Sequence, residues 1–238
     1  MANYLFLIPP SEGKSGWWID WETICSFGFN KPQSISVNAT EKDLKCTWNR
    51  YKEGIILNKT LFSGGDIEAL PAIDRYSGVM YSAIDYENMS ENWKQIFENR
   101  FLILSGMYWA LRPLDRIGNY KLPIETKWLY EFWWNQIVDM INDLDPDYVV
   151  SFLPISYWKL IYGKNKTQAK MYNEKRKFTM VNVNFLKSDG SKYTHWVKKI
   201  RWEFINNVCE QGVEDYKKFW WKVIQQENNI IDINITVD

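Results

Sequence analysis

The 238-residue sequence predicts a mixed α+β fold, formed by one compact domain over residues 1–238 with a mixed central sheet flanked by helices. Three observations support this prediction. Apolar runs of strand length are interleaved with segments whose apolar residues have helical spacing. No Pro/Ser-rich linker or low-complexity segment divides the chain. Hydrophobic residues make up 46% of the sequence, which is sufficient for one substantial core.

The first half of the chain shows five elements. The pattern predicts a strand, a long helix, a glycine-containing turn that leads into a short helix, a second long helix and a buried strand, at residues 4–8, 41–57, 62–69, 90–100 and 101–104. Thr40 and Ser90 are placed to cap the two long helices. The turn Ser63–Asp66 allows two interpretations. It forms either a helix-hairpin-helix-like unit, whose backbone amides hold a DNA phosphate, or an ordinary loop between two helices.

The second half of the chain predicts further helices and strands. They are a helix, two buried strands, a turn, two more helices and a last strand, at residues 127–144, 148–153, 178–186, 189–190, 196–209, 213–226 and 230–237. Pro146 ends the first of these helices and Pro154 closes the strand that follows it, because proline cannot continue either element.

The composition excludes several classes of protein. No stretch approaches the roughly 18 apolar residues that a membrane span requires. The first residues carry no basic segment of a signal peptide, so a cytoplasmic location without a membrane partner is expected. Three scattered cysteines predict reduced thiols. A single histidine, with no CxxC or HExxH motif, predicts neither a metal site nor a cofactor.

The net charge is zero, but the charges are segregated along the chain. Twelve Lys and Arg residues lie between Tyr157 and Arg201, against two carboxylates, and they are interleaved with aromatic residues. Five carboxylates between Glu131 and Asp147 face no basic residue. A one-sided basic face would suit a polyanion, and aromatic rings among cations can stack on bases. The alternative is a solvated surface, since lysines usually face water.

Two polar turns follow predicted strands. The turn Ser11–Lys14 comes directly after the first strand, and Arg112 and Asp115 flank a Pro-Leu step just past the strand that ends at Leu104. Arg112 is held in extended or turn backbone because it precedes Pro113. Strand ends are where α/β proteins place small-ligand sites, so these turns are candidates for one site. A structural ion pair that closes the loop is an equally good interpretation of Arg112 and Asp115.

The segment LSGMYWALRPLDRIGNYKLPIE, residues 104–125, resembles the signature of the YaaA family, which is linked to peroxide stress resistance. Four weaker segments occur in the order expected for that family. They are PPSEGK within residues 6–14, YSGVMY at 76–81, LYEFW at 129–133 and KKIR at 198–201. Trp202 stands where the family usually has glycine.

This resemblance implies a DNA-binding stress-response protein with a helix-hairpin-helix unit, which protects against hydrogen peroxide by limiting free iron. The expected partner is duplex or distorted DNA, bound by backbone contacts without sequence specificity. The residues expected to contact nucleic acid are Lys14, Arg112, Lys159, Lys164, Lys166, Lys198, Lys199 and Arg201.

Two other functions stay open at this point. One is an enzyme that acts on nucleotides or nucleic-acid bases, with Lys14, Arg112 and Asp115 as catalytic candidates. Its pocket for a nucleotide-like small molecule would be formed by Ser11, Glu12, Tyr108 and Tyr120. The other is a protein-interaction scaffold that uses exposed aromatic side chains. The sequence alone does not decide whether the chain has catalytic activity.

Overall fold

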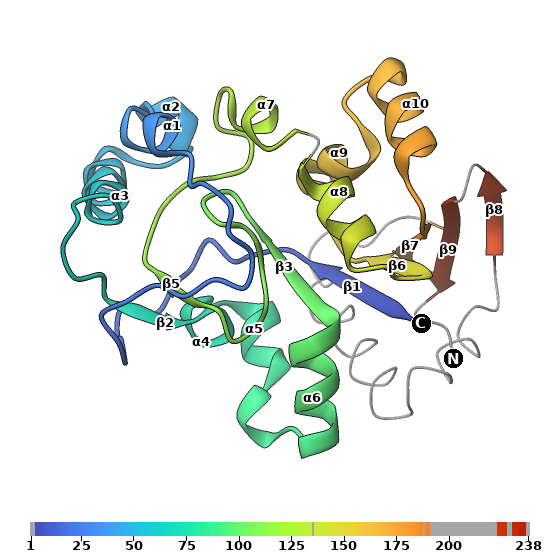
Figure 1. Ribbon diagram of the computed structural model, residues 1–238, viewed down its shortest axis with the longest axis horizontal. Helices are drawn as coiled ribbons and strands as arrows, with labels where there is room; N and C mark the ends of the chain where they lie inside the picture. Colours follow the sequence, from blue (N-terminus) through green and yellow to red (C-terminus); the bar gives the residue numbers. More distant parts are fainter. Residues whose placement is uncertain (1–2, 135, 188, 191–222, 228–229, 237–238) are drawn as a thin grey trace.

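A seven-stranded sheet runs through the centre of the computed structural model, with helices on both sides of it (Figure 1). The structure describes residues 3–134, 136–187, 189–190, 223–227 and 230–236. The order of the strands is β4-β3-β1-β6-β7-β9-β8. This arrangement confirms the predicted mixed α/β fold with a central sheet.

The five inner strands of the sheet are parallel and both edge strands are antiparallel to their neighbours. The inner strands are β3 (Phe101–Ser105), β1 (Tyr4–Ile8), β6 (Tyr148–Ser151), β7 (Thr179–Leu186) and β9 (Ile230–Thr236). The edge strands are β4 (Trp109–Leu111) and β8 (Val223–Glu227). A smaller sheet pairs β2 (Ala69–Pro71) with β5 (Arg116–Gly118).

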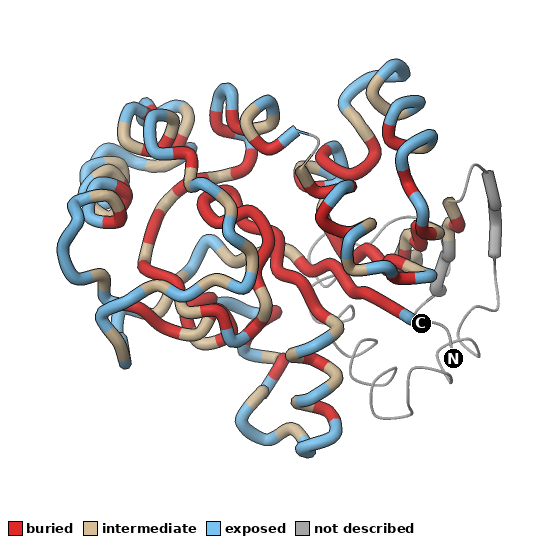
Figure 2. Tube along the Cα trace, in the orientation of Figure 1, coloured by how far each residue is buried: buried red, intermediate tan, exposed pale blue. Residues whose placement is uncertain are grey.

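The strands β1 and β3 are apolar except for Ser105, because helices cover both faces of a parallel sheet. Every residue of β1 and of β3 is buried, as the continuous buried colour along these strands shows (Figure 2). Phe6 of β1 stacks on Phe101 of β3 with ring centroids 4.7 Å apart. The core of the protein therefore lies around these two strands.

The chain changes direction across the sheet beside β1. From β1 it goes to β3 on one side, and it later returns to place β6 on the other side of β1. In open parallel sheets such a reversal leaves a crevice outside the carboxyl ends of the two strands. The carboxyl ends of β1 and β6 are therefore the first place at which to look for a ligand site.

Eleven short helical segments are described around the two sheets. In chain order they are α1 (Gln33–Val37), α2 (Glu41–Leu44), α3 (Trp48–Thr60), α4 (Ala72–Arg75), α5 (Val79–Ile84), η1 (Tyr86–Asn88), α6 (Glu91–Arg100), α7 (Leu129–Trp133), α8 (Gln136–Asp143), α9 (Ile155–Tyr162) and α10 (Lys166–Lys175). Helix α6 packs against β1 and β3 from below in Figure 1, whereas α8, α9 and α10 lie above the sheet.

Several elements predicted from the sequence are confirmed within a few residues. They are the strands at 4–8, 101–104, 148–153, 178–186 and 230–237, the turn at 189–190 and the helix at 90–100. The cap of that helix is also confirmed, because the Ser90 side chain accepts a hydrogen bond from the amide of Trp93. The predicted helix at 196–209 lies outside the described residues.

Two predicted long helices are each divided into two. The expected helix 41–57 consists of α2 and α3, because Lys45 adopts a left-handed conformation with φ of 49°. Thr40 caps α2 as predicted. The expected helix 127–144 consists of α7 and α8: it begins only after Trp128, which has φ of 69°, and it is interrupted at Trp134, which has left the helical region. Apolar spacing alone did not reveal these interruptions.

Two further predictions are wrong about the type of element. Of the expected helix 213–226, the described residues 223–226 belong to a strand, because Val223–Glu227 pairs with β9. The glycine-containing turn after α3 leads into β2 rather than directly into a helix. Pro71 favours extended backbone in the residue before it, and β2 pairs with β5. This segment therefore does not show a helix-hairpin-helix arrangement.

Candidate functional site

The turn Ser11–Lys14 follows β1 and is fixed against the segment between α4 and α5. The amide of Ser77 donates to the carbonyl of Gly13 over 2.9 Å, and the Ser11 hydroxyl donates to the carbonyl of Ser77. Gly13 fits closely at this contact, because a Cβ atom there would lie 2.8 Å from the Ser77 hydroxyl oxygen and 3.3 Å from the Ser77 carbonyl oxygen. The turn is thus a built feature of the fold and not a loose connection.

Lys14 directs its amino group into protein surroundings. Its Nζ donates to the carbonyl oxygens of Ser11 and Glu12 over 3.2 and 3.4 Å, and lies 4.3 Å from the ring centroid of Tyr120. Burial of the amine, and secondarily the positive charge of Lys121, lower the pKa of Lys14 to about 7. A large fraction of the molecules therefore carries a neutral Lys14 amine near neutral pH.

This lowered pKa has a consequence for stability. Between about pH 7 and 10.5 the unfolded chain binds one more proton at Lys14 than the folded protein does, so folding is penalised most at and below the lower limit. We expect the free energy of unfolding to rise with pH across this window relative to a Lys14→Met variant, by at most about 1.4 kcal/mol per pH unit. Urea unfolding of both proteins at several pH values measures the difference, and two parallel curves would contradict it.

A chain of hydroxyl groups lies behind Lys14. The Tyr120 hydroxyl is 2.8 Å from both the Ser105 and the Tyr76 hydroxyls. Ser105 Oγ already accepts from the amides of Met107 and Tyr108, so its proton is directed to Tyr120, and the hydroxyls of Tyr120 and Tyr76 share a further hydrogen bond. Burial raises the pKa of Tyr120 to about 12, and this phenol therefore stays protonated.

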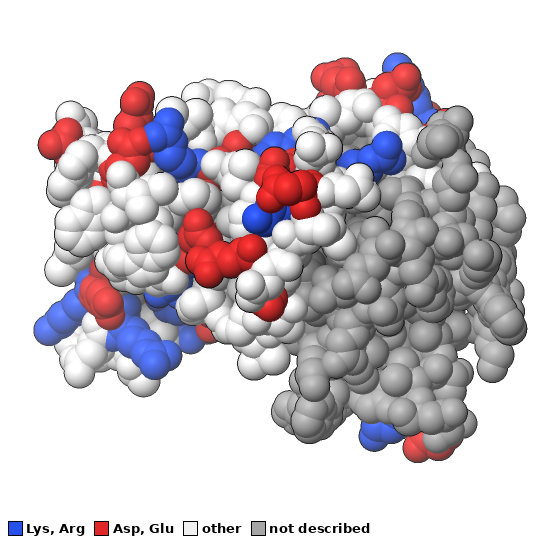
Figure 3. All heavy atoms as spheres, turned by 90° about the horizontal axis from the view of Figure 1, so that it is seen from below, with Lys and Arg blue, Asp and Glu red and all other residues white. Residues whose placement is uncertain are grey.

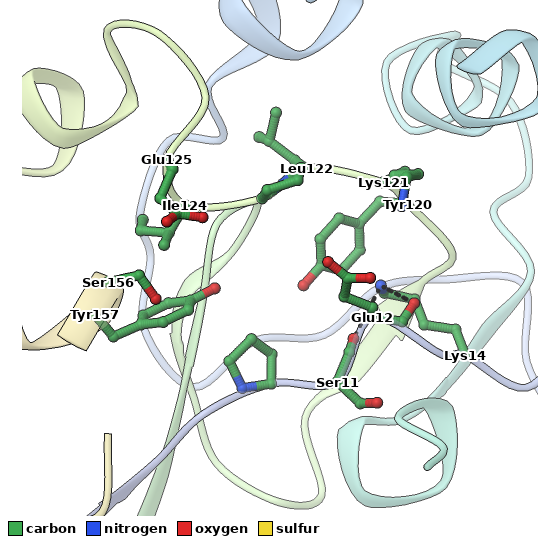
Figure 4. A pocket seen from close by; sticks show the side chains of 12 residues that line it. Ser11, Glu12, Lys14, Tyr120, Lys121, Leu122, Ile124, Glu125, Ser156 and Tyr157 are labelled. Carbon is green, nitrogen blue, oxygen red and sulfur yellow. Dashed lines mark hydrogen bonds between the residues drawn. The ribbon is translucent and has the colours of Figure 1, made fainter. Parts of the chain in front are cut away.

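A pocket of about 140 Å³ opens at the carboxyl ends of β1 and β6. Three segments line it: the turn Pro10–Lys14, the loop Tyr120–Glu125 and the start of α9 at Ser156–Tyr157. Figure 4 shows Lys14, Glu12 and Tyr120 on one side and Glu125, Ser156 and Tyr157 on the other. The pocket thus occupies the crevice that the reversal of strand order creates.

A wide, open depression adjoins this pocket and shares Glu12 and Lys121 with it. Its volume is about 830 Å³. Together the pocket and the depression bring five basic side chains to one continuous surface, which we call the cationic groove: Lys14, Lys42, Lys45, Arg50 and Lys121. Three carboxylates, of Glu12, Glu41 and Glu125, lie along it, and Glu125 pairs with Lys45 at 2.7 Å.

Lys121 is held in the groove by α3. The buried Asn58 side chain donates to the carbonyl of Lys121 and accepts from its amide, both over 2.9 Å. Gly54, one turn earlier on α3, leaves space for the aliphatic stem of Lys121, since a Cβ atom there would lie 3.0 Å from the Lys121 Cβ. Helix and lysine are therefore fixed to each other, and the amino group is presented to the groove.

The structure brings together only part of the residues that the sequence suggested for one site. Ser11, Glu12, Lys14 and Tyr120 line the pocket. Tyr108 lies behind it, with its ring edge-on to Tyr120 at 5.5 Å and its hydroxyl accepting from the amide of Gly118. Nothing in the sequence indicated that Tyr120 lines the pocket whereas Tyr108 lies behind it.

Arg112 and Asp115 lie apart from the pocket, in a loop that their own groups hold. The Asp115 carboxylate accepts from the amide of Arg112 over 2.8 Å and from the amide and hydroxyl of Ser26 over 3.0 and 2.5 Å. The Arg112 guanidinium points away, donates to the carbonyl of Asn99 and lies 5.8 Å from the Phe27 ring centroid. Burial raises the pKa of Asp115 despite these hydrogen bonds. Their geometry is that of a loop-closing structure.

Two residues of the described basic stretch pair with the acidic segment. Lys164 contacts Glu131 at 2.5 Å and Lys175 contacts Asp139 at 2.6 Å. These two pairs bring part of the charge that is segregated along the sequence together in space. Lys159 and Lys166 lie on α9 and at the start of α10. The other residues suggested for DNA contacts, Lys198, Lys199 and Arg201, lie outside the described residues.

Sequence reasoning missed most of the groove. Lys42, Lys45 and Arg50 come from the region of α2 and α3, where isolated basic residues gave no signal. Lys121 belongs to the Tyr-Lys-Leu step of the central motif and follows Tyr120 directly, which was the available clue. Among the described residues, no group of three or more His, Cys, Asp or Glu is placed to hold a metal ion. No helix in the described ranges has the length and apolar character that a membrane crossing demands.

The fold and the site define a class: a mainly parallel α/β protein with a lysine at the switch point of its sheet. A family model described as "Peroxide stress protein YaaA" matches residues 6–223, and the chain belongs to this family. Its relatives include a UPF0246 protein of Fusobacterium nucleatum, 28% identical over 77% of this chain and 71% of the relative. A UPF0246 protein of Finegoldia magna is 28% identical over 82% and 80%, and one of Alcanivorax borkumensis is 33% identical over 63% and 60%.

Proposed function

We propose that this peroxide stress protein binds duplex or distorted DNA through the cationic groove, by contacts to backbone phosphates and without sequence specificity. The observation that carries the proposal is the groove itself, which gathers the four cations Lys42, Lys45, Arg50 and Lys121 beside the Lys14 amine. A wide and open surface suits a polymer better than it suits a small molecule, which needs an enclosed pocket. Lysine and arginine contacts of this kind position a nucleic-acid backbone and release counterions.

The charge on another face supports this placement. Figure 3 shows the molecule from below, the side on which α6 lies in Figure 1, and acidic and basic groups lie next to one another over the coloured part of that face. A face of mixed charge attracts a polyanion less than a cluster of cations does. The basic residues of α9 and α10 are partly neutralised by Glu131 and Asp139. Among the described surfaces, the groove is therefore the better candidate for contacts to DNA.

Fluorescence anisotropy with labelled duplex, bubble-containing and single-stranded DNA over a salt series tests the proposal. We expect the single charge reversals Lys121→Glu and Arg50→Glu each to lower the affinity by about tenfold at low salt. The double variant should reduce the salt slope by about two, independent of the DNA sequence. Both variants should fold, because Arg50 is exposed and the side chain of Lys121 contacts α3 only through its aliphatic stem. The backbone hydrogen bonds between Lys121 and Asn58 do not depend on the Lys121 side chain.

The matched control is Lys170→Glu on α10, where the side chain is 79% exposed. It should leave the affinity within about twofold of the wild-type value. A loss at Lys170 with no loss at Lys121 or Arg50 would move the interface to the basic stretch. Absence of binding at low salt in the wild-type protein would remove the proposal.

The pocket favours a second function, an enzyme that acts on nucleotides or nucleic-acid bases. A depressed lysine pKa, a carboxylate and a protonated phenol around a small cavity are typical of catalytic sites. Thermal shift assays with a panel of nucleotides and nucleosides test this. Stabilisation by one of them that is lost in Tyr120→Phe, together with no affinity for DNA, would favour the enzyme over the DNA-binding protein.

A further inference from the structure

We propose that Lys14 forms an imine with the aldehyde of an abasic deoxyribose, in DNA held by the cationic groove. The inference rests on the proposed DNA binding and adds a covalent step to it. Loss of a base leaves a sugar that opens to an aldehyde, and flanking phosphates remain on both sides of it. A site for this lesion needs a nucleophilic amine, space for a sugar without a base and cations for the phosphates.

The geometry around Lys14 meets the first two requirements. Its Nζ is positioned by two carbonyl oxygens and by the Tyr120 ring, so its direction is fixed before a substrate arrives. The cavity that it lines has about 140 Å³, the scale of a sugar rather than of a complete nucleotide. A stacked, paired base in intact duplex cannot enter such a cavity without being extruded.

The third requirement is met where the pocket joins the depression. Glu12 and Lys121 border both spaces, so a strand that lies in the depression passes the mouth of the pocket. Lys42 of α2 and Arg50 of α3 line the depression outside the pocket, and they would contact the flanking phosphates. The amine and the phosphate contacts thus belong to one continuous surface.

The chemistry balances without a cofactor. The lone pair of neutral Nζ forms a bond to the aldehyde carbon, while the π electrons of the carbonyl move to its oxygen. Nζ gives up one proton and the oxygen gains one, which yields a carbinolamine. The hydroxyl then departs as water and a C=N bond forms, so one amine and one aldehyde give one imine and one water. Addition of water reverses the sequence and restores both groups.

The protonation state of Lys14 suits this step. Since burial lowers its pKa to about 7, the neutral amine is present near neutral pH without a separate base. An exposed lysine with an ordinary pKa near 10.4 is almost entirely protonated under these conditions. The structure therefore singles out Lys14 for this reaction from the lysines of the groove.

Reductive trapping tests the inference. The wild-type protein is incubated with a duplex that carries one abasic site, in the presence of cyanoborohydride, which delivers hydride to the iminium carbon and leaves a stable secondary amine. We expect a covalent protein–DNA adduct that maps by mass spectrometry to Lys14. No adduct is expected with intact duplex or with a duplex that contains the tetrahydrofuran analogue, because neither offers an aldehyde.

Two variants separate the amine from the charge. Lys14→Arg keeps a cation but cannot form an imine, so the adduct yield should fall at least about tenfold while affinity for intact duplex changes much less. Lys94→Arg is the matched control, since Lys94 on α6 also lies near an aromatic ring, 5.7 Å from the centroid of Tyr86, but outside the groove. Its adduct yield should equal that of the wild type.

The pH dependence provides a further readout. Trapping at Lys14 should rise through about pH 7 and then level off, as the neutral fraction of the amine saturates. A rate that keeps rising towards about pH 10 would indicate an exposed lysine and would overturn the inference. An adduct that maps to another residue, or an equal yield in Lys14→Arg, would overturn it as well.

The same samples distinguish this inference from the proposed function. Anisotropy with intact duplex is measured in parallel on each preparation. Binding of intact duplex without any adduct would overturn the imine and leave the DNA-binding proposal standing. Neither binding nor adduct would remove both. Trapping of free 2-deoxyribose 5-phosphate at Lys14 without an adduct to DNA would overturn the assignment of DNA as the substrate.

Discussion

Replacement of Arg75 by leucine is expected to lower the free energy of unfolding by about 3 kcal/mol. The Arg75 side chain is only 1% exposed, and its guanidinium donates to the carbonyl oxygens of Ser15, Trp17, Glu68 and Ile117. Removal of the donor leaves four buried or half-buried carbonyls without this partner, and each unsatisfied group costs free energy. The substitution also releases the segment that follows Lys14.

Urea denaturation, followed by tryptophan fluorescence, measures the loss. Arg50→Leu is the matched control, because Arg50 is fully exposed on α3 and the same change there should alter stability by no more than about 0.5 kcal/mol. Equal midpoints for the two variants would contradict the role of Arg75 as the link between the N-terminal segment, β2 and β5. In Arg75→Lys, which retains the charge but not the fork of donors, we expect an intermediate loss.

Substitution of Gly106 by alanine is expected to destabilise the protein by about 2–3 kcal/mol. A Cβ atom at Gly106 would lie 2.2 Å from the carbonyl oxygen of Leu122, a backbone atom of the loop that lines the pocket. Either the loop Tyr120–Glu125 moves or the turn after β3 does. Both movements disturb the contact between the Lys14 amine and the Tyr120 ring.

Gly28→Ala is the control for this change, since a Cβ atom at Gly28 meets nothing within 4 Å and its φ is not positive. Thermal unfolding of the two variants gives the comparison, and the loss in Gly106→Ala should be accompanied by an altered pH dependence of Lys14. A Gly106→Ala protein as stable as Gly28→Ala would show that the loop relaxes without cost. That result would contradict the close approach as a reason for glycine in the central motif.

The fold class and most strands could be predicted because buried parallel strands have continuous apolar sequences, as in Leu5–Ile8 and Phe101–Leu104. The ends of the helices were harder to predict. The break at Lys45 and the start of α7 after Trp128 depend on single residues with positive φ, a conformation that neither residue type favours and that tertiary contacts must stabilise. Propensity and spacing carry no information about such positions.

The candidate site was predictable only where it follows a strand directly. Ser11, Glu12 and Lys14 came from the rule that turns at strand ends hold ligands, and Tyr120 came with the central motif. Ser156 lines the same pocket as Lys14 because of the order of the strands in the sheet. Lys121 lines it because the Asn58 side chain binds the backbone of Lys121. The charge along the sequence was an incomplete guide, because Lys164 and Lys175 of the basic stretch pair with Glu131 and Asp139 of the acidic segment.

The position of β1 between β3 and β6 also determines when the site comes into existence during folding. Tyr4 pairs with Tyr148, so one wall of the pocket depends on a contact between segments that are very distant in sequence. Contacts of this kind form late, because closing a long loop costs entropy before the pairing compensates for it. A chain emerging during synthesis has no pocket until α9 has been made. Closure of the pocket on refolding should therefore lag behind the formation of the local helices.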